Sequence, residues 1–211
     1  MEINWYGHAC FRLKDRGLTV VCDPFDKSIG LPMPRLRADV VTVSHEAPGH
    51  GYVDGVKDWR KVFTGPGEYE IEGVFITGIP TLHGKEGDEK RESNTVFLFE
   101  FPDLTICHLG DLGHVLTESQ VEAMPDIDVL MVPVGGRNTL DASMAAEVIS
   151  IIEPAIVIPM HYLLPETAMH LDTVERFLKE MGVPAPEPVN ALRLTKSQLP
   201  EETQVVIMDI R

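Results

Sequence analysis

The sequence predicts an α+β protein in which two mixed β-sheets pack against each other and helices flank them. First, the N-terminal half consists of short apolar or alternating runs separated by turn residues. Second, the C-terminal half alternates apolar runs of strand length with helical patterns. Third, 211 residues are enough to bury one substantial core, so we expect a single domain over residues 1–211.

The N-terminal half is expected to form strands joined by tight turns. Asp15-Arg16-Gly17 is typical of a hairpin turn, and Gly65-Pro66-Gly67 separates two further runs. A charged stretch at residues 84–93 is expected to be a loop. The strands expected in this half cover residues 3–6, 10–14, 18–22, 39–44, 62–64, 68–71, 74–77, 95–101 and 105–108.

The C-terminal half is expected to carry the helices. Thr117 and Gln120 have the spacing of a capping box, which predicts a short helix to residue 124. Asp141 is the expected N-cap of a helix that continues to residue 152, before Pro154. An amphipathic pattern predicts a helix over residues 171–181. Strands are expected at residues 129–134, 155–160 and 204–210.

The composition indicates which kinds of binding partner and which cellular location to expect. The formal net charge is −15, and because phosphate binding needs a basic surface, we expect no nucleic-acid partner. The apolar runs are only strand length, and residues 1–5 lack the pattern of a secretory signal. We therefore expect no membrane partner and a cytoplasmic location. Cys10, Cys22 and Cys107 lie in apolar runs and are expected to be small buried hydrophobic residues.

Candidate metal ligands follow several of the expected strands. Imidazoles and carboxylates supply the nitrogen and oxygen ligands of Zn²⁺, and loops at strand ends are where such scaffolds carry reactive groups. One histidine after a strand is weak evidence, but several such endings in one chain predict a metal site. His108 itself is expected to be a structural strand residue. The candidates at strand ends are His45, His50, His83, Asp111, His114 and His161.

Segments spread over the whole chain then form a recognisable series. They are Trp5-Tyr6-Gly7-His8-Ala9-Cys10-Phe11, Val43-Ser44-His45 with His50, Leu82-His83, Cys107-His108-Leu109-Gly110-Asp111-Leu112-Gly113-His114, Pro133-Val134-Gly135-Gly136 and Ile158-Pro159-Met160-His161-Tyr162. In this order they resemble the zinc-dependent hydrolases of the metallo-β-lactamase fold, in the branch that includes the ascorbate-6-phosphate lactonase type. The resemblance implies an αβ/βα sandwich of two mixed sheets flanked by helices.

The resemblance also implies a ligand set and an activity. His45 and His83 would help to hold one metal, His50 and His161 would help to hold a second, and Asp111 would bridge both. Such a centre activates water for attack on a carbonyl or phosphoryl group. The implied function is hydrolysis of a small ester, lactone or phosphate-bearing molecule. Zinc is the implied cofactor, with manganese and iron as open alternatives.

The chain departs from the family motif His-x-His-x-Asp-His at two positions. Ala47 stands in place of the middle histidine and Gly49 in place of the aspartate. Neither side chain can coordinate a metal, so each site keeps two histidines and a share of Asp111. The number of metal ions is therefore open: the site could hold two, one or none, since a catalytic zinc site needs three protein ligands. Glu46 is the nearest spare carboxylate, and we expect it to point elsewhere.

Four further side chains are candidates near the site. His8, in a turn between two strands, is expected to face the substrate or support a ligand, and a structural role is equally open. His114 is expected to act in catalysis by orienting Asp111 or contacting substrate. Arg137 follows two glycines and could present its charge to an anion, although an ordinary tight loop is the simpler interpretation. Tyr162 is expected to orient a substrate or to pack.

Three functions stay open on this basis. The first is a metal-dependent hydrolase with a depleted metal site and a small-molecule substrate. The second is a catalytically inactive binding protein of the same fold, because Ala47 and Gly49 are both chemically silent. The third is an iron site that handles oxygen, as in some relatives of the fold. A homo-oligomer is open in each case.

Overall fold

The structure is a computed structural model that describes residues 1–211 except 33, 85–86, 89 and 168. Its N-terminal sheet has the strand order β14-β1-β2-β3-β5-β7. The strands are β1 (Glu2–Trp5), β2 (Phe11–Asp15), β3 (Leu18–Cys22), β5 (Val40–Thr42), β7 (Lys61–Phe63) and β14 (Leu192–Arg193). Neighbouring strands from β14 to β3 are antiparallel, and β3, β5 and β7 are parallel.

The C-terminal sheet has the strand order β15-β13-β12-β11-β10-β9-β8. Neighbouring strands from β8 to β11 are antiparallel, and the remaining neighbours are parallel. The strands are β8 (Gly67–Ile71), β9 (Val74–His83), β10 (Glu92–Glu100), β11 (Thr105–His108), β12 (Val129–Pro133), β13 (Ile156–Met160) and β15 (Gln204–Val205). Two mixed sheets confirm the predicted α+β sandwich.

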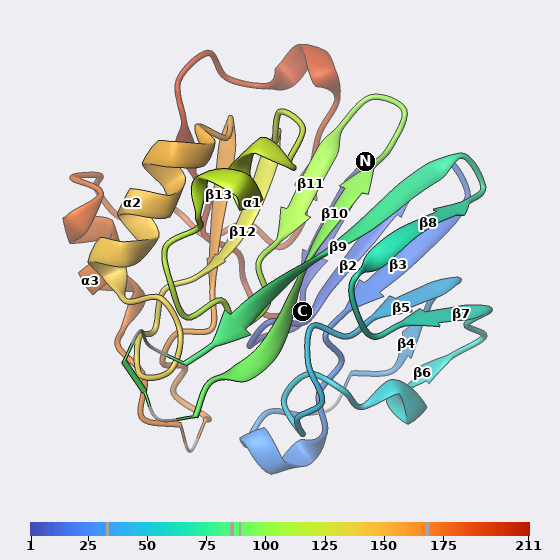
Figure 1. Ribbon diagram of the computed structural model, residues 1–211, viewed down its shortest axis with the longest axis horizontal. Coiled ribbons are helices and arrows are strands. Elements are labelled where there is room, and N and C mark those ends of the chain that lie inside the picture. Colours follow the sequence, from blue (N-terminus) through green and yellow to red (C-terminus); the bar gives the residue numbers. More distant parts are fainter. Residues whose placement is uncertain (33, 85–86, 89, 168) are drawn as a thin grey trace.

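Helices cover part of this sandwich. The α-helices are α1 (Glu118–Glu122), α2 (Ala142–Ile152) and α3 (Val174–Glu180). Figure 1 shows them together beside β12 and β13, with the strands of the N-terminal sheet on the other side of the molecule. A small pair, β4 (Leu36–Arg37) and β6 (Val56–Lys57), accompanies β5 and β7. Single 3₁₀ turns lie at η1 (Lys27–Ile29), η2 (Val53–Gly55) and η3 (Lys196–Gln198).

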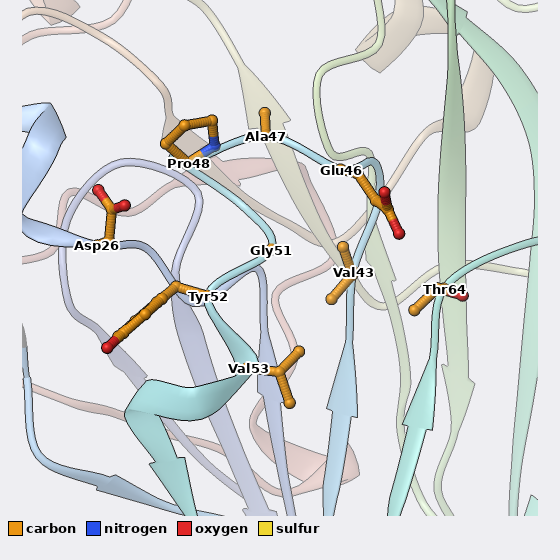
Figure 2. Close-up of a pocket in the computed structure, with 9 residues that line it drawn as sticks. All are labelled: Asp26, Val43, Glu46, Ala47, Pro48, Gly51, Tyr52, Val53 and Thr64. Carbon is orange, nitrogen blue, oxygen red and sulfur yellow. The ribbon is translucent and has the colours of Figure 1, made fainter.

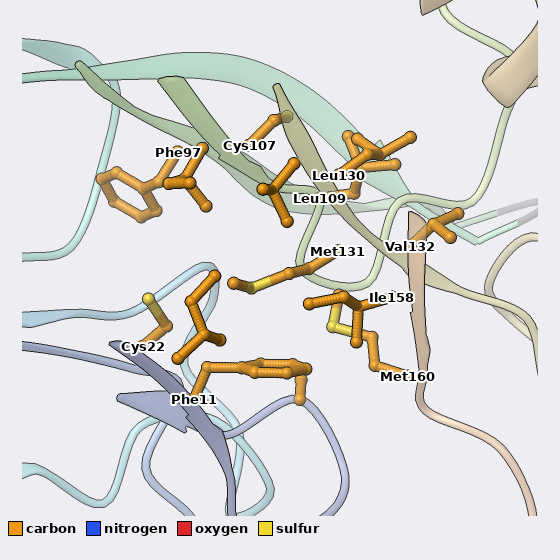
Figure 3. Packing of buried hydrophobic residues seen from close by; sticks show 14 of the residues in the cluster. Phe11, Cys22, Phe97, Cys107, Leu109, Leu130, Met131, Val132, Ile158 and Met160 are labelled. Carbon is orange, nitrogen blue, oxygen red and sulfur yellow. The ribbon is translucent and has the colours of Figure 1, made fainter. Parts of the chain in front are cut away.

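The core lies between the two sheets. Every residue of β12 and β13 is buried, as expected for parallel strands that are covered on both faces. In Figure 3, Phe11 and Cys22 of the N-terminal sheet point toward Met131 and other side chains of the C-terminal sheet. All three cysteines are free and buried, and burial raises the pKa of each thiol. They are the small core residues that the sequence predicts.

The predicted caps are confirmed in detail. Thr117 accepts a hydrogen bond from the backbone N–H of Gln120, whose side chain accepts one from the backbone N–H of Thr117. The Asp141 side chain caps α2 through the backbone N–H of Met144. Side chains that satisfy these otherwise unpaired donors are the reason each helix begins at the predicted residue.

Several predicted bounds were wrong. The strand predicted over residues 74–77 continues to His83 because β10 pairs with β9 from Phe75 to His83, past Gly78 and Pro80. Residues 92–93 of the predicted loop belong to β10, and residues 85–86 and 89 lie outside the described residues.

At the C-terminus, the predicted helix and strand both contract. The helix begins at Val174, because the backbone N–H of Asp172 bonds to Gly135 O instead. The strand predicted over residues 204–210 ends at Val205, after which residues 207–209 bond to Val189. Over the described residues, no helix has the length and apolar character needed to cross a membrane.

Candidate metal centre

The predicted ligands converge from loops that follow strands of both sheets. His45 and His50 lie in the loop after β5, and His83 is the last residue of β9. Asp111 lies in the turn after β11, and His161 follows β13 directly. These side chains come from distant parts of the sequence, yet all five line one cavity. The strand-end pattern therefore did identify a group that meets in space.

Asp111 lies at the centre of this group and is buried. Its Oδ2 atom lies 3.2 Å from His50 Nε2 and 3.4 Å from His161 Nε2. The same oxygen lies 3.7 Å from His83 Nε2 and 3.8 Å from His45 Nε2. Four imidazole nitrogens thus surround a single carboxylate oxygen.

The side chains fall into two donor sets. The first set is His45, His83 and Asp111, and the second set is His8, His50 and His161. Within each set, the potential ligand atoms all lie within 4.8 Å of one another. Asp111 belongs to the first set but also faces His50 and His161, so it adjoins both. The structure adds His8, which the sequence placed only near the site, to the second set.

Asp23 braces the second set from behind. Its side chain is fully buried, and Oδ2 lies 2.7 Å from His50 Nδ1. The same carboxylate accepts hydrogen bonds from the backbone N–H and the hydroxyl of Ser44, at 2.7 and 2.6 Å. A carboxylate behind a histidine fixes the orientation of the ring. Here it directs Nε2 of His50 toward Asp111 and His8.

The charge states follow from burial and neighbours. Burial disfavours the charged form of His50, but Asp111 and Asp23 outweigh it and raise its pKa to about 10. Burial also opposes ionisation of Asp111, yet His161 and His50 hold its pKa well below the usual range. Burial, together with His161 and His50, lowers the pKa of His8. Asp111 is therefore a carboxylate and His8 a neutral imidazole, the forms that coordinate metals, whereas His50 carries a proton that metal binding must release.

An unpaired buried acceptor indicates that this group fits a cation. Asp111 Oδ1 has no hydrogen-bond partner among the described residues; His161 Nδ1 has none either, but Nε2 is the His161 nitrogen that lies near Asp111. Leaving a buried acceptor unpaired costs about 1–3 kcal/mol, and more for a charged group. Five imidazoles and one carboxylate are also the donor types that bind zinc and other divalent transition metals. The residues present therefore fit a divalent metal.

Backbone strain is concentrated around the same group. His8, Asp23, Arg137 and His161 have φ values of 53°, 45°, 62° and 52°, in the left-handed region that non-glycine residues rarely adopt. Such residues cost on the order of 1–3 kcal/mol each and cluster at functional sites. Four of them at one site indicate that the fold maintains this arrangement against a local cost.

The group opens onto a cavity of about 380 Å³. Arg137 lines this cavity beside the ligand-type residues, and among the described residues that line it no other is a lysine or arginine. The Gly135-Gly136 turn that carries Arg137 is fixed by hydrogen bonds from Asp172 to Gly135 O and from Gly136 to Leu140 O. These hydrogen bonds place Arg137, an exposed residue, at the wall of the cavity, where the anion-facing alternative and the ordinary tight loop both stay open.

Glu46 belongs to a neighbouring cavity of about 400 Å³, shown in Figure 2. Its carboxylate points away from Ala47, which lines both cavities. The prediction that Glu46 points elsewhere agrees with this placement. Ala47 thus contributes only a methyl group at the wall of the first set.

Two predicted site residues are placed elsewhere. His114 Nε2 accepts a hydrogen bond from the backbone N–H of Leu82, and Nδ1 lies 2.8 Å from Val115 O. Both ring nitrogens are therefore used by the backbone, and the catalytic role predicted for His114 gains no support. Tyr162 is buried against Trp5, with ring centroids 5.4 Å apart. Of the two roles expected for Tyr162, orienting a substrate or packing, this placement matches packing.

The sequence interpretation missed two positioning residues, Asp23 and Asn94. Asp23 follows β3 directly, so the strand-end rule that selected the histidines would also have selected it. Asn94 Oδ1 accepts a hydrogen bond from the backbone N–H of Asp111, and its amide donates to Leu109 O and Thr81 Oγ1. Asn94 lies inside β10, where nothing in the sequence distinguishes it from an ordinary strand residue.

Comparison with known proteins agrees with this geometry. A family model for the β-lactamase superfamily domain matches residues 2–161. A solved structure from Thermotoga maritima, assigned to the Zn-dependent hydrolases of the metallo-β-lactamase superfamily, is 44% identical with a TM-score of 0.81. The match covers 98% of this chain and 97% of that one. The chain belongs to the metallo-β-lactamase superfamily.

Its sequence relatives include proteins named as metal-dependent hydrolases. A UPF0173 metal-dependent hydrolase of Carboxydothermus hydrogenoformans is 28% identical over 77% of this chain and 84% of the relative. Another, from Methanopyrus kandleri, is 27% identical over 87% of this chain and 94% of the relative. The metallo-β-lactamase resemblance predicted from the sequence is confirmed.

Proposed function

We propose that this metallo-β-lactamase superfamily protein hydrolyses a small ester, lactone or phosphate-bearing substrate with the help of zinc. The observation that carries the proposal is the convergence of Asp111 with His45, His50, His83 and His161 on one cavity. Five imidazoles beside one carboxylate favour zinc over the harder cations, which prefer oxygen ligands. Manganese and iron are the alternatives that a metal analysis distinguishes.

The chain's own residues have separate tasks in this proposal. A divalent metal, when bound, supplies Lewis acidity that activates water and polarises a carbonyl or phosphoryl oxygen. Asp111 and the histidines of the two donor sets would hold it. Asp23 fixes the ring of His50, and Asn94 fixes the backbone of Asp111.

The cavity supports a small substrate with an anionic group. A volume of about 380 Å³ lies at the lower end of the range for small-molecule sites. Arg137 lines this cavity, and a guanidinium can bind a phosphate or carboxylate through two parallel hydrogen bonds. We therefore infer that a phosphate-bearing ester or lactone is the preferred class.

Activity measurement on metal-loaded protein tests the proposal. Purified protein is stripped of metal, reloaded with Zn²⁺, Mn²⁺ or Fe²⁺, and assayed on matched ester and lactone panels with and without a phosphate group. We expect turnover that requires metal and is faster on the phosphorylated members. Metal-saturated protein that turns over none of them would favour the inactive binding protein instead.

The role of Arg137 has its own test. Arg137→Gln should raise KM for phosphorylated substrates by about 10-fold or more, because a charge-assisted hydrogen bond contributes about 1.5–3 kcal/mol. KM for neutral substrates should stay unchanged. Arg37→Gln is the matched control, since Arg37 forms an exposed ion pair with Asp58. Equal effects of the two substitutions would remove Arg137 from the substrate site.

A further inference from the structure

The space beside Gly49 is already occupied by another residue of the site. A Cβ atom placed on Gly49 would lie 2.7 Å from His8 Nε2 and 3.2 Å from His8 Cδ2, well inside van der Waals contact. Gly49 has no left-handed backbone conformation that would require glycine. The reason for glycine at this position is therefore the imidazole of His8, which lies where a side chain at position 49 would extend.

His8 is held in this place by the backbone around it. Its carbonyl oxygen accepts hydrogen bonds from the indole N–H of Trp5 at 3.0 Å and from the backbone N–H of His161 at 3.2 Å. His108 Nε2 lies 2.9 Å from the carbonyl oxygen of Ala9, the next residue. His8 is buried, and its φ of 53° is maintained by these contacts. The backbone from which the ring extends is thus fixed by the fold.

The donor atom of His8 faces the other members of the second set. His8 Nε2 lies 3.0 Å from His50 Nε2, and the His8 and His161 ring centroids are 4.4 Å apart. Two imidazole nitrogens at that separation can share one proton, or both can bind one cation. His8 Nε2 is also the atom nearest to the space beside Gly49, so the nitrogen that faces His50 is the one that occupies this space.

We propose that His8 is a metal ligand that takes the place of the motif aspartate absent at Gly49. The second set is then a three-imidazole site formed by His8, His50 and His161, with Asp111 beside it. His8 and Gly49 act as one exchange, because the imidazole can enter only if position 49 has no side chain. This inference rests on the proposed function only in assuming that the site holds a metal.

A reciprocal exchange of side chains tests the inference. The variants are His8→Ala, Gly49→Asp and the double variant H8A/G49D, with His170→Ala as the control because His170 is an exposed histidine. Each protein is stripped of metal and titrated with Zn²⁺, and metal content is measured after dialysis. Visible spectra of the Co²⁺-loaded proteins report the exchange of an imidazole for a carboxylate. Melting curves of the metal-free proteins show whether each variant is folded.

His8→Ala should weaken Zn²⁺ binding at the second set by more than about 100-fold, since even the loss of a residue that supports a ligand costs 10–100-fold. Gly49→Asp should bind no better than His8→Ala, because the new side chain meets the imidazole. The double variant should recover affinity to within about 10-fold of the parent, with an altered Co²⁺ spectrum. His170→Ala should match the parent.

Two results would overturn the inference. Either His8→Ala keeps the parent affinity and stoichiometry, or the double variant binds as weakly as His8→Ala while it is folded. These readouts are independent of turnover. If metal-loaded parent protein hydrolyses nothing, the proposed function fails and the assignment of His8 stands on its own titration.

Discussion

The two donor sets differ in how the fold responds to a lost ligand. In the second set, His8 from the turn between β1 and β2 fills the space beside Gly49. In the first set, Ala47 contributes only a methyl group, while Glu46 points away from it. A missing ligand in a local motif is therefore informative only when the whole structure is considered, because a replacement can come from any loop that reaches the site.

The two sets differ in burial and support as well. The side chains of His50 and His161 are 3% and 5% exposed, whereas those of His45 and His83 are 7% and 16% exposed. His50 rests on the fully buried Asp23, while His45 Nδ1 has the hydroxyl of Ser44 at 3.1 Å. A carboxylate brace is stronger than a hydroxyl. We therefore expect the second set to bind the first equivalent of metal.

The largest effect is expected at Asp111, because it adjoins both donor sets and its loss should affect both. Asp111→Asn keeps the shape of the side chain but removes its charge. Metal binding to both sets and hydrolysis should each fall by more than about 100-fold, because a ligand loss exceeds the loss of a supporting partner. Metal analysis and steady-state kinetics measure this, with Asp128→Asn as a control carboxylate outside the site. Retention of both metals would mean that Asp111 is no ligand.

Single substitutions should separate the two sets. His161→Ala should remove the tighter metal and His83→Ala the weaker one. A metal at 100 times its Kd stabilises a protein by about 2.7 kcal/mol, which is roughly 5–10 °C in Tm for a chain of this size. The shift caused by low Zn²⁺ should therefore persist in His83→Ala and vanish in His161→Ala. Differential scanning fluorimetry decides this, and equal loss in both variants would contradict the ranking.

A smaller effect is expected from Asp23, the carboxylate that holds the ring of His50 in the second set. Asp23→Asn preserves volume and can keep the hydrogen bond that Oδ1 accepts from the Ser44 backbone N–H, but its NH₂ group cannot accept from the Ser44 hydroxyl or from His50 Nδ1. Affinity for the first equivalent of Zn²⁺ should fall by about 10–100-fold, while the second equivalent stays unchanged. Isothermal titration in competition with a chelator resolves the two steps. If Asp23→Asn changed the affinity for the second equivalent of Zn²⁺ alone, the second set would not be the one that binds the first equivalent.

The smallest effect is a gain of affinity in the depleted set. Ala47→His would return an imidazole to the wall of the cavity beside His45. Binding of the second equivalent should tighten by about 10-fold, because a third imidazole adds to two imidazoles and a carboxylate. Ala47→Leu, which offers no ligand atom, should leave it unchanged. If both variants behave alike, position 47 does not face the metal of the first set.

The sequence predicts the fold well because its signals are local. Helix starts are predicted by capping residues such as Thr117 and Asp141. The strands β12 and β13 are predicted by their apolar runs. The failures have a common cause in long-range pairing. β9 runs past Pro80 because β10 supplies its partners, and β14 exists because Glu2 and Ile3 pair with Arg193 and Leu192.

The candidate site was also predictable where its signals are local, and was not where they depend on long-range packing. The strand-end positions of His45, His83 and Asp111 were readable, since each follows or ends an apolar run. The contact between His8 and Gly49 was not, because it joins residues 41 positions apart through the packing of two loops. The substitution of the aspartate is visible in the sequence, but its compensation exists only in three dimensions.

The most direct test of the central claim is a zinc anomalous-difference map from crystals of the protein grown with Zn²⁺. The account predicts zinc within about 2.0–2.1 Å of the Nε2 atoms of His8, His50 and His161. Zinc bound by His50 and His161 while His8 stands clear of it would contradict the account, as would a site that stays without zinc in these crystals.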